Sequence, residues 1–216
     1  MLWEFPATGA LSDLTYHGNG EETYPDRSQA GVVGVHHTTV RETHVDYIVP
    51  GENGNRHQTR WLALQNPASG SGVAFAAPPG QTVDFGAHPY SIEDLDRATE
   101  ARQLRHDGGS VYLTLDHRQM GVGGDDSWSP SVHEAYRLPS GTYSWTTRLI
   151  PIPAGTERSE ITRLILDTEQ PAHYTEASFE PRAGISSPGW VRHIPAVLVS
   201  LVAMAGGWLY YNPGGS

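Results

Sequence analysis

Short apolar runs separated by Gly, Pro, Asn and Asp fill the sequence from Leu2 to about Pro153 and restrict what this chain can fold into. In the run 111–115, Val and Leu alternate with Tyr and Thr, as in a β-strand with one buried and one solvated face. The 24 Gly and 16 Pro residues suit tight turns better than long helices. The sequence therefore predicts a mostly β domain, with further strands at 45–49, 60–64, 73–76, 133–138 and 143–149.

One segment interrupts the strand pattern and predicts a short helix. Ser91 followed three residues later by Asp94 resembles a capping box, in which each side chain accepts a hydrogen bond from the other residue's backbone. Ile92 and later apolar residues then recur at roughly helical spacing. We expect a helix at about 92–103 that ends at Asp107-Gly108-Gly109, because glycine adopts the left-handed conformation that closes helices.

The character of the sequence changes after Pro153, where the chain becomes polar. We predict one β domain at 1–153 and an extension of unclear fold at 154–216. The extension contains a candidate strand at 161–166 and a linker rich in Pro, Gly and Ser at 181–190.

An almost uncharged apolar run at 194–211 is about 18 residues long, the lower limit for a helix that spans a bilayer. Pro195, Gly206 and Gly207 make it an indifferent helix. A membrane anchor and a non-native or disordered extension are both open, and we favour the extension. No basic patch followed by an apolar core opens the chain, so we expect no signal peptide and a cytoplasmic location.

The charge balance and the missing cysteines exclude several classes of function. The 14 Lys and Arg residues, all of them Arg, stand against 24 acidic residues and give a formal net charge of -10, which disfavours nucleic acid as a partner. Without Cys the chain has no disulfide, no thiol nucleophile and no cysteine metal site.

The most distinctive segment is LDHRQMGVGGDDSWSPS at 115–131. It indicates a strand that ends near Gln119, followed by a loop that contains Gly121, Gly123 and Gly124. Glycines permit the positive φ angles and sharp reversals that other residues resist. We therefore expect a tight loop at this point.

The second half of this segment gives the loop its chemistry. Asp125 and Asp126 can accept hydrogen bonds from nearby backbone N–H groups, Ser127 adds a polar support, and Pro130 stiffens the exit. A rigid loop of this kind would present Trp128, whose ring suits the C–H face of a pyranose and whose N–H suits a hydroxyl. Taken alone, a Trp in a Gly-rich loop more often plugs the edge of a core.

Three motifs together resemble the C-terminal domain of family 2 β-galactosidases. GGDDSWSPS resembles that family's signature, GNGEETYPDR at 18–27 resembles its GNGPEETY-x-DR segment, and ENGNRHQTRW at 52–61 resembles its QENGNR-x-x-x-RW segment. With Pro89-Tyr90-Ser91 at the helix start, they cover about 2–150 in the family's order. Gly51 stands where the family usually has Gln, and the Pro expected after Gly20 is missing, which affects local loop geometry.

The resemblance implies an antiparallel β-sandwich resembling galactose mutarotase, of which this chain carries the C-terminal half. In the family, two glutamates on a separate (β/α)₈ barrel hydrolyse β-galactosides such as lactose, and that barrel often uses Mg and Na. The resemblance therefore implies no catalytic residue and no cofactor in this chain. It assigns substrate binding to Trp128, loop support to its neighbours, and a β-galactosidase large chain or missing N-terminal domains as the partner.

Two other groups of residues suggest functions that we weigh against solvated or structural roles. His36, His37 and His44 resemble metal ligands, and Asp125-Asp126 resembles part of a Ca²⁺ site, but clustered His residues in an acidic chain are usually solvated and paired carboxylates need further ligands. We expect no metal site in this chain.

Arginines follow two of the motifs and have a structural explanation. Arg27, Arg56 and Arg60 would pin loops through carboxylates such as Asp26, Glu52 or Glu22, and a role as sugar ligands is the alternative. For the whole chain, the alternative to a β-galactosidase part is a carbohydrate-binding or mutarotase-like β-sandwich protein that acts alone.

Overall fold

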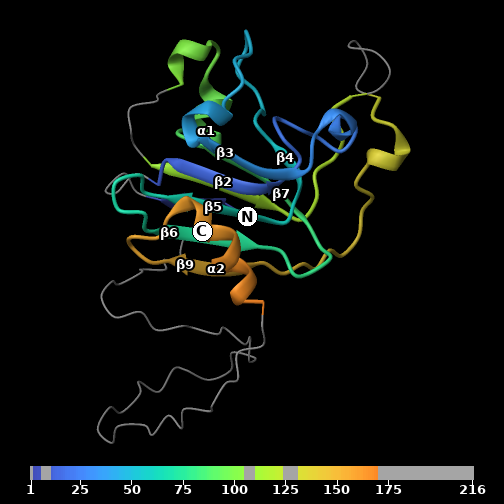
Figure 1. Cartoon of the computed structure of the whole chain (residues 1–216). Helices are drawn as coiled ribbons and strands as arrows, with labels where there is room; N and C mark the ends of the chain where they lie inside the picture. The colour runs from blue at the N-terminus through green and yellow to red at the C-terminus, as the bar shows by residue number, and fades with distance from the viewer. Residues whose placement is uncertain (1, 6–10, 105–109, 124–130, 170–216) are drawn as a thin grey trace, which may run out of the picture. The chain divides into compact units, whose positions relative to one another are not determined.

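The computed structural model describes residues 2–5, 11–104, 110–123 and 131–169, which form two antiparallel sheets stacked face to face (Figure 1). The four-stranded sheet has the order β1 (Leu2–Phe5), β8 (Val111–Asp116), β7 (Val83–His88), β4 (Arg56–Thr59). The five-stranded sheet has the order β3 (Gly34–Thr39), β2 (Asp13–Gly18), β5 (Trp61–Gln65), β6 (Gly72–Ala76), β9 (Arg148–Ile152). The predicted all-β antiparallel sandwich is confirmed.

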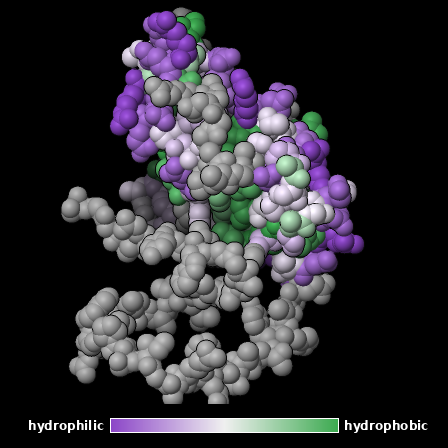
Figure 2. Space-filling view, turned by 90° about the vertical axis from the view of Figure 1, so that its left-hand side faces the viewer, coloured by the Kyte–Doolittle hydropathy of each residue, from purple (hydrophilic) through white to green (hydrophobic). Residues whose placement is uncertain are grey.

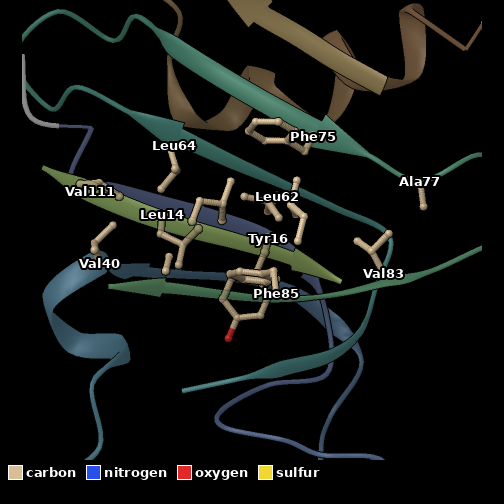
Figure 3. Packing of buried hydrophobic residues seen from close by; sticks show 13 residues of the cluster. Leu14, Tyr16, Val40, Leu62, Leu64, Phe75, Ala77, Val83, Phe85 and Val111 are labelled. Carbon is tan, nitrogen blue, oxygen red and sulfur yellow. The ribbon is translucent and has the colours of Figure 1, made fainter. Parts of the chain in front are cut away.

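An apolar core fills the space between the two sheets (Figure 3). Phe75 from β6 and Phe85 from β7 are fully buried, and the Tyr16 ring of β2 lies 5.4 Å from the Phe85 ring between centroids. Trp3 of β1 packs on Phe75 with ring centroids 5.5 Å apart. In Figure 2, polar residues cover most of the described surface on the visible face, and apolar residues gather between them.

The predicted alternation at 111–115 is confirmed, because successive residues of β8 alternate between buried and half-buried positions. The strands predicted at 60–64 and 73–76 correspond to β5 and β6. β5 differs from an ordinary half-wet strand, because all five of its residues are buried. A strand buried on both faces needs a layer on each side.

The second layer over β5 is the helix α2 (Ile161–Asp167), where the sequence predicted a strand. Ile161 and Ile165 are fully buried and pack with Trp61 and Ala63 of β5 and with residues of β6 and β9. Their spacing of four residues places them on one face of a helix. In a strand, Leu164 would point to the face opposite to theirs. The apolar sheet face selects the helix.

Ion pairs join this C-terminal segment to the five-stranded sheet. Arg158, at the start of the 3-10 turn before α2, lies 3.0 Å from the Asp13 carboxylate, and Arg148 of β9 lies 3.0 Å from the Glu169 carboxylate. Both pairs link residues beyond 153 to strands of the domain. The domain boundary predicted at 153/154 stays a prediction.

Three strand predictions are wrong or shifted. Residues 45–49 form an irregular loop in which Tyr47, Ile48 and Val49 are all exposed. This segment therefore has no buried face of the kind that a strand in a sheet would have. Residues 133–138 contain a 3-10 turn, and the strand predicted at 143–149 begins only at Arg148. Local alternation does not supply the neighbouring strand that a sheet requires.

The helix predicted at 92–103 is confirmed in its first half as α1 (Ile92–Arg97). The capping box is present: Asp94 N donates to Ser91 Oγ at 3.0 Å, and Ser91 N donates to Asp94 Oδ2 at 3.2 Å. At Ala98 the backbone turns extended, which ends the helix. The 3-10 turns lie at Ser28–Ala30 (η1), Val40–Thr43 (η2), Ala101–Gln103 (η3), Glu134–Tyr136 (η4) and Arg158–Glu160 (η5).

The described residues all belong to one compact unit. The predicted helix stop at 107–109, the linker at 181–190 and the apolar run at 194–211 lie outside the described residues. Within the described ranges, no helix has the length and apolar character needed to cross a membrane.

We expect Ile165→Ala to lower the free energy of unfolding by about 2–5 kcal/mol, because it empties a fully buried site between α2 and the sheet. Leu166→Ala, at an exposed position on the same helix, should change it by less than about 0.5 kcal/mol. Urea unfolding of both variants measures the difference. Equal stabilities would contradict the packing of α2 on β5.

Candidate functional site

The segment 22–27 and the segment 52–57, two of the three sequence motifs, are joined by reciprocal hydrogen bonds. Thr23 N donates to Asn55 O at 2.8 Å, and the Asn55 side-chain amide donates to Thr23 O at 2.8 Å. His57 N donates to the Thr23 hydroxyl at 3.0 Å. Asn55 is fully buried, so these bonds satisfy polar groups that water does not reach.

Gly54 makes this junction sterically feasible. Its φ is +73°, and a Cβ there would lie 2.6 Å from Thr43 O. Its N–H donates to Glu22 Oε1 at 2.6 Å, while Tyr47 OH donates to Glu22 Oε2 at 3.2 Å. Both oxygens of this carboxylate therefore hold loops together.

Arg56 is buried and stabilises the loop, and it is not exposed as a sugar-binding residue would be. Its guanidinium donates to Gly54 O at 2.6 Å and to Tyr16 OH at 3.3 Å, and it lies 5.8 Å from the centre of the Tyr16 ring. The prediction that this arginine pins a loop is correct, but the described partners are a carbonyl and a phenol instead of a carboxylate.

The other two arginines differ from Arg56. Arg27 Nε lies 3.9 Å from the Asp26 carboxylate, a contact of the predicted kind but a loose one. Arg60 is exposed and donates to Gln58 O at 3.3 Å.

The base of the Gly-rich loop is held by Asp26 of the YPDR segment. Val122 N donates to Asp26 Oδ1 at 3.2 Å, and Gly123 N donates to Asp26 Oδ2 at 3.1 Å. Gly121 N donates to Tyr136 O at 2.9 Å. One carboxylate thus satisfies two successive backbone amides, and the third motif joins the other two.

Gly121 and Gly123 serve close packing, not the positive φ angles that the sequence suggested, since neither has one. A Cβ on Gly121 would lie 2.9 Å from both Asp26 Cγ and Tyr136 Cβ. A Cβ on Gly123 would lie 3.0 Å from Arg27 Nη2. Gly121 lets Asp26 approach the backbone, and Gly123 leaves room for Arg27.

The remaining predicted loop residues lie outside the described residues. They are Gly124, Asp125, Asp126, Ser127, Trp128 and Pro130. The roles of Trp128 in substrate binding and of its neighbours in loop support stay predictions.

Asp84 of β7 is a structural hub that sequence reasoning missed. Its buried carboxylate accepts hydrogen bonds from Gln58 N at 3.0 Å and Gln119 N at 2.9 Å, and His57 Nδ1 lies 2.8 Å from it. Gln58 has a φ of +56°, at an irregularity in the pairing of β4 with β7. The only signal in the sequence is one acid within an apolar strand run.

A hollow of about 510 Å³ opens beside the loop base. Its walls include His57 and Gln119 from the Asp84 hub, Tyr136 from the loop base, and Arg118 and Arg137. These side chains offer a ring and several hydrogen-bonding groups, which suit a ligand rich in hydroxyls.

Glu52 interacts with the Gln119 side chain and with two other carboxylates, and it is still partly exposed to solvent. Desolvation by burial raises the pKa of Glu52, and the nearby carboxylates of Asp116 and Glu22 raise it further, while a hydrogen bond with the Gln119 side chain acts in the opposite direction. The ionised form of Glu52 is therefore disfavoured in the folded chain.

The histidines suggested as metal ligands are not brought together. His36 Nε2 lies 2.8 Å from Val32 O, and His37 Nδ1 lies 3.2 Å from the Thr15 hydroxyl. His44 Nδ1 lies 2.7 Å from Tyr90 OH. In the described part of the chain, no group of three or more His, Asp or Glu side chains is placed to hold a metal ion.

We expect Gly121→Ala to loosen the loop base, because a methyl group would displace the Asp26 carboxylate from its two amide partners. Hydrogen exchange at Val122 N and Gly123 N should accelerate, and stability should fall by about 1–3 kcal/mol. Gly141→Ala is the matched control, since nothing lies within 4 Å of the added Cβ. Unchanged exchange in Gly121→Ala would show that the packing is looser than described.

We expect Glu52→Gln to change how stability depends on pH. A raised pKa means that the folded chain binds protons more readily than the unfolded chain, so wild-type stability falls as pH rises above the ordinary value of 4.5. Glu52→Gln does not lose stability in this way, so above pH 4.5 urea unfolding should show it to be more stable than the wild type. Below that pH the two proteins should be equally stable. Glu21→Gln removes one acid from the neighbouring motif and is the control for the change in net charge.

Comparisons with known proteins agree with this arrangement of motifs. Residues 3–149 match the family of the beta galactosidase small chain. The chain is 36% identical over 150 residues to a beta-galactosidase of Vibrio vulnificus, which covers 68% of this chain and 13% of the relative. It is 39% identical over 141 residues to one of Vibrio cholerae (65% and 13%) and 37% identical over 134 residues to one of Lactococcus lactis (62% and 13%).

This chain therefore spans about an eighth of the length of these relatives, and its three motifs and their hydrogen-bonded junction fall within the matched region. It belongs to the β-galactosidase small chain family.

Proposed function

We propose that this chain forms one carbohydrate-binding wall of a β-galactosidase active site and that a large chain supplies the catalytic glutamates. The observation that carries the proposal is the pair of hydrogen bonds from Val122 N and Gly123 N to Asp26. They fix the start of the loop that leads to Trp128. Order at the loop base reduces the entropy that would be lost when the aromatic ring contacts a sugar.

The surface beside the loop base supports a carbohydrate ligand. The hollow next to Tyr136 and Gln119 is of the size of small-ligand sites and has a mixed polar and apolar lining. Trp128 would then stack on a terminal β-D-galactoside such as lactose as it first docks, and would influence which leaving group is accepted.

Three of the described carboxylates support placing the chemistry on another polypeptide. Retaining glycosidases need two carboxyl groups about 5–5.5 Å apart that face the sugar. Asp26, Asp84 and Glu22 each use both oxygens to hold backbone or side-chain groups of this chain. They hold loops in place and are poorly disposed to act on a glycosidic bond.

The test is hydrolysis of lactose by this chain, by the β-galactosidase large chain of the same organism, and by their mixture. We expect activity in the mixture and none from this chain alone. Hydrolysis by the isolated chain would overturn the proposal. Binding of galactose or lactose by a chain that never associates with the large chain would instead identify a carbohydrate-binding protein that acts alone.

We expect Trp128→Ala to raise the KM of the mixture by roughly 5- to 150-fold, which corresponds to about 1–3 kcal/mol for a lost aromatic contact. The kcat should change less, because the ring binds the substrate without taking part in bond cleavage. Trp128→Phe keeps an aromatic face and should recover part of the loss. An unchanged KM in Trp128→Ala would remove this residue from the site.

A further inference from the structure

A hollow of about 890 Å³ lies against the edge strand β3, and Arg27, which approaches Gly123 of the loop base, is part of its lining. Tyr16 and Arg56 contribute to its floor, and both are buried and bonded to other groups of the chain. Its walls come from the segments 20–23, 31–38 and 42–45.

Two exposed apolar segments lie in or next to the segments that line this hollow. Val32 lines it and is 72% exposed, with Val33 and Val35 exposed beside it. The loop 47–49, which follows Val45 of the lining, exposes Tyr, Ile and Val, and Ile48 is 96% exposed. Of the 14 large hydrophobic side chains that are exposed in the described ranges, these two segments contain six. Such clustering marks an interaction surface better than scattered apolar residues do.

Both apolar segments are braced. Tyr47 OH donates to Glu22, which itself lines the hollow, and Val45 N donates to Asn53 Oδ1 at 3.0 Å. On the opposite side, His36 Nε2 lies 2.8 Å from Val32 O. In Figure 1, the light-blue loop that carries residues 47–49 projects beyond the sheets near α1. Apolar side chains that are ordered before binding lose little entropy when a partner covers them.

We propose that this hollow and its two apolar borders are the surface on which the β-galactosidase large chain docks. The inference rests on the proposed function and deepens it by naming the contact surface. The relatives carry the matched region within polypeptides of which it forms only 13%, so a much larger body of protein accompanies it there. A segment with apolar side chains would cover Val32 and Ile48.

The charges at the walls fit a polar rim around that apolar contact. Glu21, Glu42 and Arg27 are all part of the lining. Backbone and side-chain hydrogen bonds from Thr39 lower the pKa of Glu42 and so favour its ionised form. Charged rims orient a partner, while apolar contacts contribute most of the affinity.

The experiment measures the affinity of the full chain for the large chain by isothermal titration calorimetry. We expect Ile48→Asp and Val32→Asp each to weaken binding by about tenfold or more, because each places a charge in an apolar contact. Leu166→Asp is the matched control at a 51% exposed apolar position on α2 and should stay within about twofold of wild type. Thermal melts check that every variant is folded.

The outcomes separate this inference from the proposed function. If wild type binds the large chain and both border variants bind equally well, the docking surface is elsewhere and the proposed function stands. If Leu166→Asp weakens binding as much as Ile48→Asp does, the effect is one of net charge and the inference is overturned. If wild type does not bind at all, the proposed function fails and this inference fails with it.

Discussion

The carboxylate of Asp26 stands where two loops nearly a hundred residues apart in sequence meet, and it accepts hydrogen bonds from two successive backbone amides. Without it, Val122 N and Gly123 N would be left to water or to weaker partners. The same segment bonds through Thr23 to buried Asn55 and through Glu22 to Gly54. These loops are not ordered by the hydrogen bonds of the sheets. They are ordered by polar side chains that have few other hydrogen-bond partners available.

The sandwich was predictable wherever the sequence encodes local geometry. The alternation in β8 and the Ser91 and Asp94 cap of α1 depend on neighbours in sequence, and both were found. The loop at 45–49 shows the limit, because a β-branched run becomes a strand only if another strand lies beside it. The helix α2 was missed for the converse reason, since an apolar sheet face selected its conformation.

The sequence predicted which residues belong to the candidate site much better than it predicted how they are arranged in space. The motifs identified Glu22, Asp26, Gly54, Gly121 and Gly123, but not that one carboxylate would bind the backbone beside the last two. Asp84 carries no motif and takes its role from groups far away in sequence, so only coordinates could reveal it. A sequence pattern gives little information on which buried polar groups will pair when they are far apart in the chain.

The family region ends at residue 149, yet the apolar layer over β5 continues through α2 to Ile165. A polypeptide trimmed to the family limit would leave Trp61, Ala63 and Ala74 facing water and would lack most of β9. Such a bare sheet face invites self-association. The smallest stable unit of this protein is therefore set by its second apolar layer, and recombinant forms need to extend at least to Glu169, which pairs with Arg148 of β9.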